Sequence, residues 1–212
     1  MKGLFITFEG PDGSGKTTQI NMLKDYLENK GFEVILTREP GGTELGEEIR
    51  KILLDLKHKE MDEKAEMLLY AAARAQHVSK LIKPALLQGK IVLCDRFVDS
   101  SYAYQGVGRG LGIKLVEQVN EIALSGVYPD LTIFLNIEPK MGLVRSAHSK
   151  GFPDRLESEK IGFHEKVREG FLRVCEQNPN RVKETDARDS IEQVFKTVAE
   201  HVNYLIRQKN DI

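Results

Sequence analysis

The stretch LFITFEGPDGSGKTT (residues 4–18) joins an apolar run to a glycine-rich loop, and it decides the fold. Its first five residues are short, apolar and β-prone, which predicts a buried strand. A helical pattern of apolar residues follows the loop. Within the loop, Gly10, Gly15, Lys16 and Thr17 satisfy the spacing G-x-x-x-x-G-K-[ST]. This spacing between a strand and a helix predicts a phosphate cradle.

Composition and charge limit the class of protein. The 212 residues are 41% hydrophobic and 30% charged, with a formal net charge of −1, which fits a single domain over residues 1–212. This balance argues against a nucleic acid or an anionic membrane as partner, so any anion site must be local. Residues 1–10 do not fit a signal peptide, and no apolar run reaches membrane-spanning length. Cys94 and Cys175 fit no metal or disulfide motif, and we expect a cytoplasmic protein.

Strand-like and helix-like segments alternate along the chain. Beyond the first strand, further β-prone runs lie at residues 33–37, 91–95, 131–137 and 181–186. This alternation predicts an α/β fold with three layers (αβα), in which the middle layer is a five-stranded parallel sheet. Ligands of such sheets bind beyond the carboxyl ends of the strands. Asp12, Arg38 and Asp95 all fall at those ends.

The loop chemistry indicates a purine nucleotide with Mg²⁺. Backbone N–H groups and the following helix N-terminus bind phosphate oxygens, Lys16 adds positive charge, and the Thr17 hydroxyl suits a magnesium ion. A GTP-binding switch would also carry an NKxD element late in the chain. The Asn-Lys pair here, Asn29–Lys30, is followed by Gly-Phe, which disfavours a switch.

A second anion site is predicted beside the loop. Arg38 in TREPGGT and Arg96 in CDRFVDSS each follow a predicted strand, and two guanidiniums there can hold a phosphate bidentately. Asp95 suits a role in holding Mg²⁺, directly or through water. The alternative for each arginine is an ordinary surface salt bridge.

Nearly the whole chain resembles the thymidylate kinase family. The resemblance rests on FEGPDGSGKTT, TREPGGTELGEEIR, LLYAAARAQHV, DRFVDSSYAYQG, PDLTIFL, DRLE and TDARDSIEQV. It implies a P-loop kinase fold with a short mobile LID at about residues 141–157 and a homodimer packed through helices. It also implies phosphorylation of dTMP to dTDP with ATP and Mg²⁺ by in-line transfer, feeding dTTP synthesis.

On the donor side, the resemblance implies an ATP site made of loop, LID and late-turn residues. These are Gly10, Gly13, Ser14, Gly15, Lys16, Thr17, Thr18, Arg145, Ala187 and Arg188. Arg145 is expected to stack on adenine, and Ala187 and Arg188 to form the turn that contacts it. The metal ligands implied are Thr17, Asp95 and Glu157.

On the acceptor side, the resemblance implies that Arg38 and Arg96 clamp the dTMP phosphate. Arg74 would bind the thymine edge, and Tyr70 would stack on the ring where the family more often has Phe. The other residues expected to line the thymidine pocket are Ser100, Ser101, Tyr104 and Gln105. Tyr70 and Arg74 are also spaced i, i+4, so a plain helix-face pair is the alternative.

Asp12 matches an acid that faces the acceptor in this family. It is expected to position the acceptor and Arg96 without removing a proton. The alternative is an Asx-turn, in which the side chain merely caps the loop backbone.

The basic segment after the fourth strand resembles the LID. One subgroup of the family carries a catalytic arginine after the P-loop acid, where this chain has Gly13. The other subgroup takes its cation from the LID, so Lys150 and Arg155 are the candidates for that catalytic role. Asp154 and Glu157 match acids near the acceptor and its Mg²⁺.

Two other functions stay open from the sequence. A nucleotide kinase of another specificity, or a nucleoside kinase, would share the loop, although two phosphate-binding arginines argue against a nucleoside acceptor. A nucleotide-binding regulatory module without turnover would also share it, although Lys16, Thr17, Asp95 and Arg96 are all present.

Overall fold

The computed structural model describes residues 3–149 and 154–210, the side chains of 147–149 and 210 excepted. A central sheet is formed by β1 (Leu4–Glu9), β2 (Val34–Arg38), β3 (Ile91–Asp95), β4 (Leu131–Asn136) and β5 (Val182–Asp186). The strands pair in the order β2-β3-β1-β4-β5, and every pairing is parallel. The predicted five-stranded parallel sheet is therefore confirmed.

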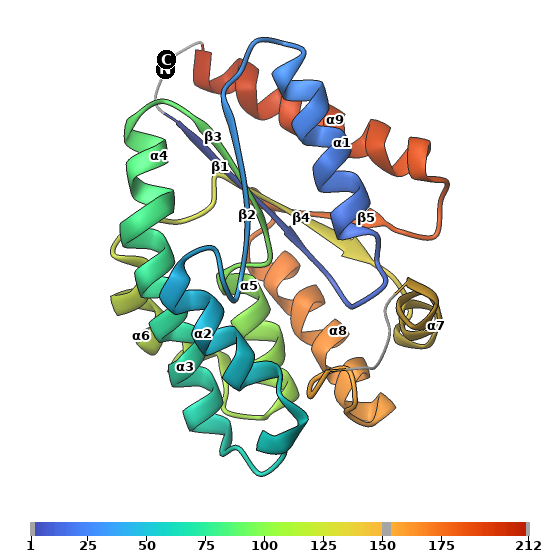
Figure 1. Cartoon of the computed structure of the whole chain (residues 1–212). Helices are drawn as coiled ribbons and strands as arrows, with labels where there is room; N and C mark the ends of the chain where they lie inside the picture. Colours follow the sequence, from blue (N-terminus) through green and yellow to red (C-terminus); the bar gives the residue numbers. More distant parts are fainter. Residues whose placement is uncertain (1–2, 150–153, 211–212) are drawn as a thin grey trace.

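Helices cover both faces of this sheet (Figure 1). The α-helices are α1 (Lys16–Glu28), α2 (Glu44–Leu54), α3 (Glu63–His77), α4 (Lys83–Leu87), α5 (Val98–Ser101), α6 (Ile113–Leu124), α7 (Pro139–Ser149), α8 (Ile161–Gln177) and α9 (Ile191–Asn210). Shorter helical segments are the 3₁₀ turn η1 (Leu56–His58) and the π-helical η2 (Val78–Ile82) and η3 (Tyr102–Gly108). Figure 1 shows α1 and α9 on one side of the sheet and α3, α6 and α8 on the other. No helix within the described residues is long and apolar enough to cross a membrane.

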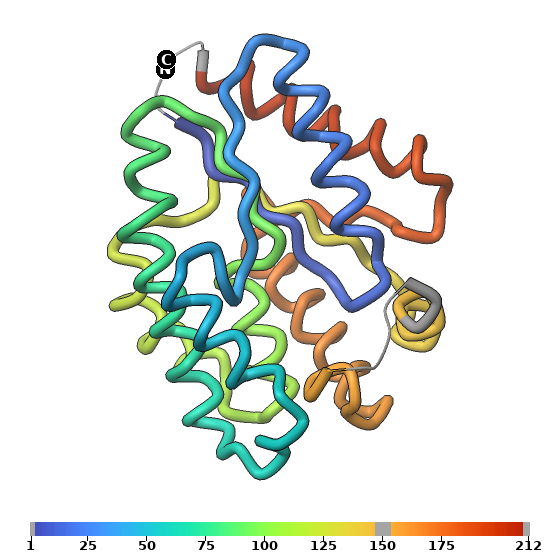
Figure 2. Tube along the Cα trace, in the orientation of Figure 1, coloured from blue at the N-terminus to red at the C-terminus, as the bar shows by residue number. Residues whose placement is uncertain are grey.

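The alternation of side chains along β1 explains why two cores form. Leu4, Ile6 and Phe8 pack with apolar residues of α1 and α9, whereas Phe5 packs with the cluster on the opposite face. Every residue of β1 is buried, as expected for a central strand covered by helices on both faces. The path of the chain through these layers can be followed in Figure 2.

The register of the sheet brings the ends of three strands together. Arg38 at the end of β2 pairs with Asp95 at the end of β3, and Phe8 of β1 pairs with the same Asp95. The loop after β1 therefore lies beside the ends of β2 and β3. This is the edge at which ligands of open parallel sheets bind.

The region after β3 is more helical than its glycines suggested. The run GVGRGLG (residues 106–112) is rich in glycine, yet the helix of α5 and η3 continues to Gly108. Close packing against α8 accounts for this, because a Cβ on Gly170 would lie 2.7 Å from the Cα of Ala103. A glycine on α8 thus lets η3 approach, and tertiary contact overrides local propensity.

Candidate functional site

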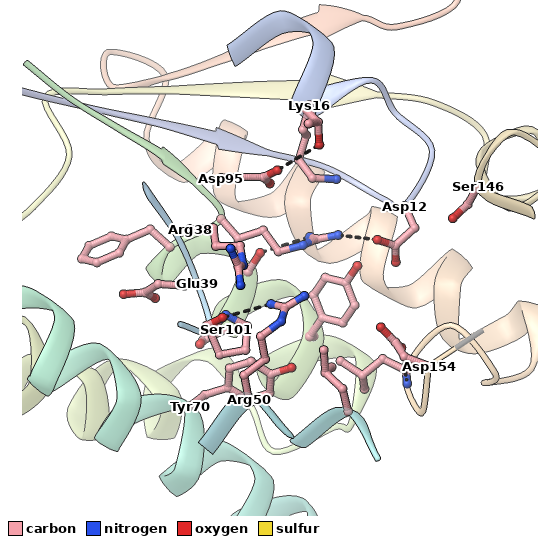
Figure 3. Close-up of a pocket in the computed structure, with 18 of the residues that line it drawn as sticks. Asp12, Lys16, Arg38, Glu39, Arg50, Tyr70, Asp95, Ser101, Ser146 and Asp154 are labelled. Atoms are coloured by element: carbon pink, nitrogen blue, oxygen red, sulfur yellow. Dashed lines mark hydrogen bonds and ion pairs between the residues drawn. The ribbon is translucent and has the colours of Figure 1, made fainter. Parts of the chain in front are cut away.

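A cavity of about 530 Å³ opens where β1, β2 and β3 end (Figure 3). Most predicted site residues line it: Asp12, Gly13, Gly15, Lys16, Thr17, Thr18, Arg38, Tyr70, Arg74, Asp95, Arg96, Ser100, Ser101, Tyr104, Gln105 and Arg145. Predicted residues outside its lining are Gly10, Ser14, Arg155, Glu157, Ala187 and Arg188. Lys150 lies outside the described residues. The segments that sequence reasoning selected thus meet at one place.

Lys16 is held over the loop by backbone carbonyls. Its Nζ donates to Gly10 O at 3.0 Å and to Pro11 O at 2.9 Å. Burial lowers the pKa of Lys16 to about 8, and nearby Arg96 acts in the same direction. The residue begins α1, so its charge and the positive end of the helix dipole act at the same point.

Gly13 is the point at which the loop touches α7. Its φ is 72°, in the left-handed region that favours glycine. A Cβ there would lie 2.0 Å from the carbonyl oxygen of Gly142. Backbone contact therefore excludes any larger side chain at this position, including the arginine that one subgroup of the resembled family carries.

Thr17 and Asp95 place two oxygen ligands beside Lys16. Thr17 Oγ1 donates to Asp95 Oδ2 at 3.4 Å, and both residues line the cavity. Hydroxyl and carboxylate oxygens fit the ligand preference of Mg²⁺. In residues 3–149 and 154–210, no three His, Cys, Asp or Glu side chains gather as a metal cluster. A magnesium ion here would draw its other ligands from phosphate and water.

Asp12 lies beside the guanidinium of Arg96. Arg96 Nη2 donates to Asp12 Oδ1 at 2.9 Å, and Nη1 donates to Gly10 O at 2.9 Å and to Ser100 Oγ at 3.3 Å. Both side chains of the ion pair are only 17% exposed. The φ of Arg96 is 69°, a costly conformation for a residue with a Cβ. The acid in the anion-binding loop is therefore charge-paired within the site.

Glu9 was missed by the sequence analysis. It ends β1 and is fully buried, and its Oε1 accepts from Phe97 N at 2.7 Å while Oε2 accepts from Ser100 Oγ at 2.5 Å. Burial, reinforced by the neighbouring Asp99 carboxylate, raises the pKa of Glu9 to about 8. An acid directly between an apolar strand and the glycine loop is the signal that could have found it.

Arg74 is fixed by partners from four parts of the chain. Its Nε donates to Glu39 Oε2 at 2.8 Å, Nη1 to Ser101 Oγ at 2.9 Å and to Asn120 Oδ1, and Nη2 to Phe97 O at 3.0 Å. Four of its five N–H groups are thus engaged, and the side chain is 1% exposed. Glu39 and Asn120 are further residues that sequence reasoning missed.

Two more guanidiniums reach the cavity from β2 and α2. Arg38 Nη2 donates to Glu47 Oε2 at 2.8 Å, and the Arg38 side chain is 52% exposed. Arg50 Nη1 donates to Pro40 O at 2.9 Å, and burial together with nearby Arg38 lowers the pKa of Arg50. Arg50 was not predicted, and a basic residue on an amphipathic helix carries no sequence signal that marks it as a site residue.

Two tyrosines form the apolar part of the lining. The Arg96 guanidinium lies 5.2 Å from the ring centroid of Tyr104, within cation–π range. Burial raises the pKa of both Tyr70 and Tyr104, so the two hydroxyls stay protonated near neutral pH. The cavity therefore combines neutral aromatic surface with a cationic wall.

The segments predicted to contact adenine meet at the edge of α7. Arg145 Nη1 donates to Ala187 O at 2.9 Å, which brings the LID and the late turn together. Arg188 is directed to Asp186, with Nη2 and Oδ2 2.5 Å apart, and its side chain is 62% exposed.

Arg155 lies outside the cavity lining. It is 5% exposed, its N and Nε donate to Leu54 O at 3.1 Å and Leu53 O at 2.7 Å, and its Nη2 lies 2.7 Å from Glu66 Oε2. These contacts tie the end of the LID to α2 and α3. Glu157 is directed to the start of the same turn, where its Oε2 accepts from the backbone N–H of Asp154 at 3.2 Å.

The fold and the loop define a P-loop nucleotide phosphotransferase. The doubly covered parallel sheet places the phosphate loop between its central strand and the first helix. A wall of guanidiniums lies across the same cavity, where a second phosphorylated ligand can bind.

Comparison with known proteins narrows this class. The thymidylate kinase family model matches residues 8–198. The thymidylate kinase of Geobacillus sp. is 54% identical over 92% of this chain and 93% of its own, and that of Anoxybacillus flavithermus is 47% identical over 98% and 100%. The crystal structure of thymidylate kinase from Ehrlichia chaffeensis is 38% identical with a TM-score of 0.77, covering 96% of this chain and 99% of that one. The chain belongs to the thymidylate kinase family.

Proposed function

We propose how the residues of this cavity carry out the activity of the family. The chain phosphorylates dTMP with ATP, giving dTDP for dTTP synthesis. One observation carries the assignment of roles: a phosphate loop and a cluster of guanidiniums line one cavity. Transfer between two phosphates needs alignment and charge neutralisation more than covalent help.

The donor side is the loop and the start of α1. The backbone N–H groups of residues 12–18 and the charge of Lys16 bind the ATP phosphates. Thr17 and Asp95 hold Mg²⁺, which supplies neutralisation of phosphate charge when it is bound. The contact between Arg145 and Ala187 supports their joint role at adenine, with Arg188 beside them.

The acceptor side holds the dTMP phosphate between Arg38 and Arg96. Arg50 lines the same cavity and is a third candidate for this anion. Asp12 positions Arg96 through their 2.9 Å ion pair. The acceptor is already a phosphate, so the reaction requires no general base, and Asp12 removes no proton.

The nucleoside part of dTMP lies deeper in the cavity. Tyr70 stacks on the base and Arg74 donates to its edge, and Ser101 and Gln105 lie close enough to take part. Tyr104 packs against the deoxyribose, where a 2′-hydroxyl would collide. Ser100 supports the phosphate side through its contact with Arg96.

The LID is proposed to span about residues 141–157 of the single domain 1–212. Its closure would exclude water and limit ATP hydrolysis. Lys150 stays a predicted catalytic cation. The contacts of Arg155 with Leu53, Leu54 and Glu66 favour an anchoring role for this residue and give its predicted catalytic role no support. Glu157 stays a predicted metal ligand.

We also propose a cytoplasmic homodimer that binds neither nucleic acid nor membrane. Large apolar side chains are exposed on α2, α3 and α6, namely Leu45, Ile52, Leu68, Leu115 and Ile122. Ile122 is 83% exposed, which is unusual for an isoleucine and fits burial against a second copy. Sedimentation of the wild type and of Ile122→Glu tests this, because the variant should sediment as a monomer.

The activity is tested by ADP release from purified protein with ATP and Mg²⁺. The acceptors compared are dTMP, dUMP, dCMP, UMP, AMP and thymidine. Strong release with dTMP, little with UMP and AMP, and none with thymidine is expected. ATP binding without acceptor-dependent release would contradict the assignment and favour a binding module.

A further inference from the structure

The side-chain amide of Gln105 has its orientation fixed by Glu66. Gln105 lines the cavity and is 1% exposed, and its Nε2 donates to Glu66 Oε1 at 2.8 Å. An ionised carboxylate offers only acceptors, so the NH₂ end of the amide must face it. The carbonyl Oε1 of Gln105 is then the atom that remains for a ligand in the cavity.

Glu66 is held in its ionised form by two guanidiniums. It is fully buried on α3, and its Oε2 accepts from Arg109 Nη2 at 3.0 Å and lies 2.7 Å from Arg155 Nη2. Burial would raise the pKa of Glu66, but the hydrogen bonds from Arg109 and Gln105 and the charge of Arg155 lower it. A carboxylate that stays ionised cannot donate, so it cannot accommodate a reversed Gln105 amide.

Gln105 and Arg74 together present a pattern that one kind of base edge fits. Both residues line the cavity, where Arg74 offers a donor and Gln105 offers an acceptor. Thymine and uracil carry a carbonyl next to the N3–H group, which complements this pair. Cytosine reverses both, with an amino group next to an N3 acceptor. Cytosine would therefore place a donor against the Arg74 donor and an acceptor against the Gln105 acceptor. Leaving such groups unpaired in a buried pocket is costly, so cytosine is rejected.

We propose that Glu66 is a positioning residue that sets base specificity: by fixing the Gln105 amide, it makes the pocket select bases with an N3–H group over cytosine. Glu66 acts through Gln105 and touches no substrate. The inference rests on the proposed placement of the base beside Arg74 and Gln105. The wild-type assay with dTMP is therefore done first. If the wild type does not phosphorylate dTMP, the proposed function itself is wrong. If it does, the Glu66 variants test this inference alone.

The decisive variant is Glu66→Gln. Its amide can donate as well as accept a hydrogen bond, so the Gln105 amide can rotate by half a turn and exchange its oxygen and nitrogen. The ratio of kcat/KM for dTMP to that for dCMP is expected to fall about tenfold. Gln105→Leu should lower the ratio as well, and adding Glu66→Gln to it should change nothing further, since the effect passes through Gln105. An unchanged ratio in folded Glu66→Gln, or a further fall in the double variant, would overturn the proposal.

Glu159→Gln is the matched control. Arg109 donates from Nη1 to Glu159 Oε1 at 2.5 Å, whereas its Nη2 donates to Glu66. Among the described residues, no hydrogen bond joins Glu159 to Gln105. The same chemical change there should leave the ratio at its wild-type value, and a comparable fall would point to the ion cluster as a whole.

If Glu66→Gln does not fold, the wild-type protein still decides the matter. The Gln105 amide resonance is identified by its loss in Gln105→Leu. Its protons should be protected from hydrogen exchange with and without dTMP, because they face Glu66. Exchange at the rate of a solvent-exposed amide would contradict the assigned orientation.

Discussion

The donor and acceptor sides of the cavity are built differently. The proposed donor side is one continuous stretch, residues 10–18, with Lys16 as its cation. The proposed acceptor side is assembled from β2, α3, the end of β3 and α5, and Arg74 and Arg96 are held there by hydrogen bonds from distant parts of the chain. This difference teaches that the donor side depends on local loop conformation and the acceptor side on long-range polar contacts. The two sides should therefore be separable by mutation.

The largest effect is expected at Lys16. Lys16→Met removes the cation that we propose lies beside the transferred phosphate, and turnover should fall about a thousandfold. The variant should fold normally, because within the described part of the chain the Lys16 ammonium donates hydrogen bonds to loop groups alone. ADP release measures the loss, and a fall of less than tenfold would mean that the charge on the donor side comes from elsewhere.

A large loss of stability is expected on the acceptor side. Arg74→Met leaves the Glu39 carboxylate buried without this guanidinium, and breaking such a buried pair costs about 3 kcal/mol or more. Urea denaturation measures the loss. Lys24→Met, which breaks an exposed pair with Glu28, is the control and should cost far less stability than Arg74→Met. Equal losses would show that the acceptor network adds no special stability.

Arg38 offers a binding effect without a stability effect. Its side chain is half exposed, so Arg38→Met should leave the unfolding free energy nearly unchanged. Loss of one arm of the phosphate clamp should raise KM for dTMP about tenfold with a smaller change in kcat. Steady-state kinetics against dTMP at saturating ATP decides this, and a change confined to KM for ATP would place Arg38 on the donor side.

The smallest effect is the pH dependence that Glu9 contributes. Its pKa is raised to about 8 in the folded chain from an ordinary value of 4.5. The unfolded chain releases this proton near pH 4.5 and the folded chain retains it, so stability should fall as pH rises from about 5 to 8. Relative to Glu9→Gln, the wild type should lose about 1 kcal/mol between pH 6 and 7. Parallel stability curves for the two proteins would show that Glu9 is ionised when folded.

The contrast between a contiguous donor side and a dispersed acceptor side explains what could be predicted from sequence. The phosphate loop is contiguous, so its glycines, Lys16 and Thr17 identify it without a structure. The parallel sheet follows from the alternation of apolar strands with helices. Arg96 was selected with Arg38 from its place after a predicted strand. Arg74 was selected only through a family resemblance, because an isolated arginine on a helix has many structural uses.

Three buried acids in and around the site were not predicted. Glu9, Glu39 and Glu66 lie in three separate parts of the chain, and the sequence analysis assigned a role to none of them. Their importance comes from burial and from partners more than 25 positions away along the chain. Arg155 shows the converse: a catalytic role was predicted for it from the resemblance, and the structure shows it buried in contact with Leu53 of α2 and Glu66 of α3.

Calorimetric titration of dTMP into two variants tests the separation of the two sides most directly. Lys16→Met should bind dTMP with a Kd within about twofold of wild type, because the acceptor network is intact. Arg96→Met should lose most of its affinity, about a hundredfold, since it loses the phosphate clamp and leaves Asp12 without this guanidinium. Comparable losses of dTMP affinity in both variants would contradict the account, because the donor and acceptor sides would then form one coupled site.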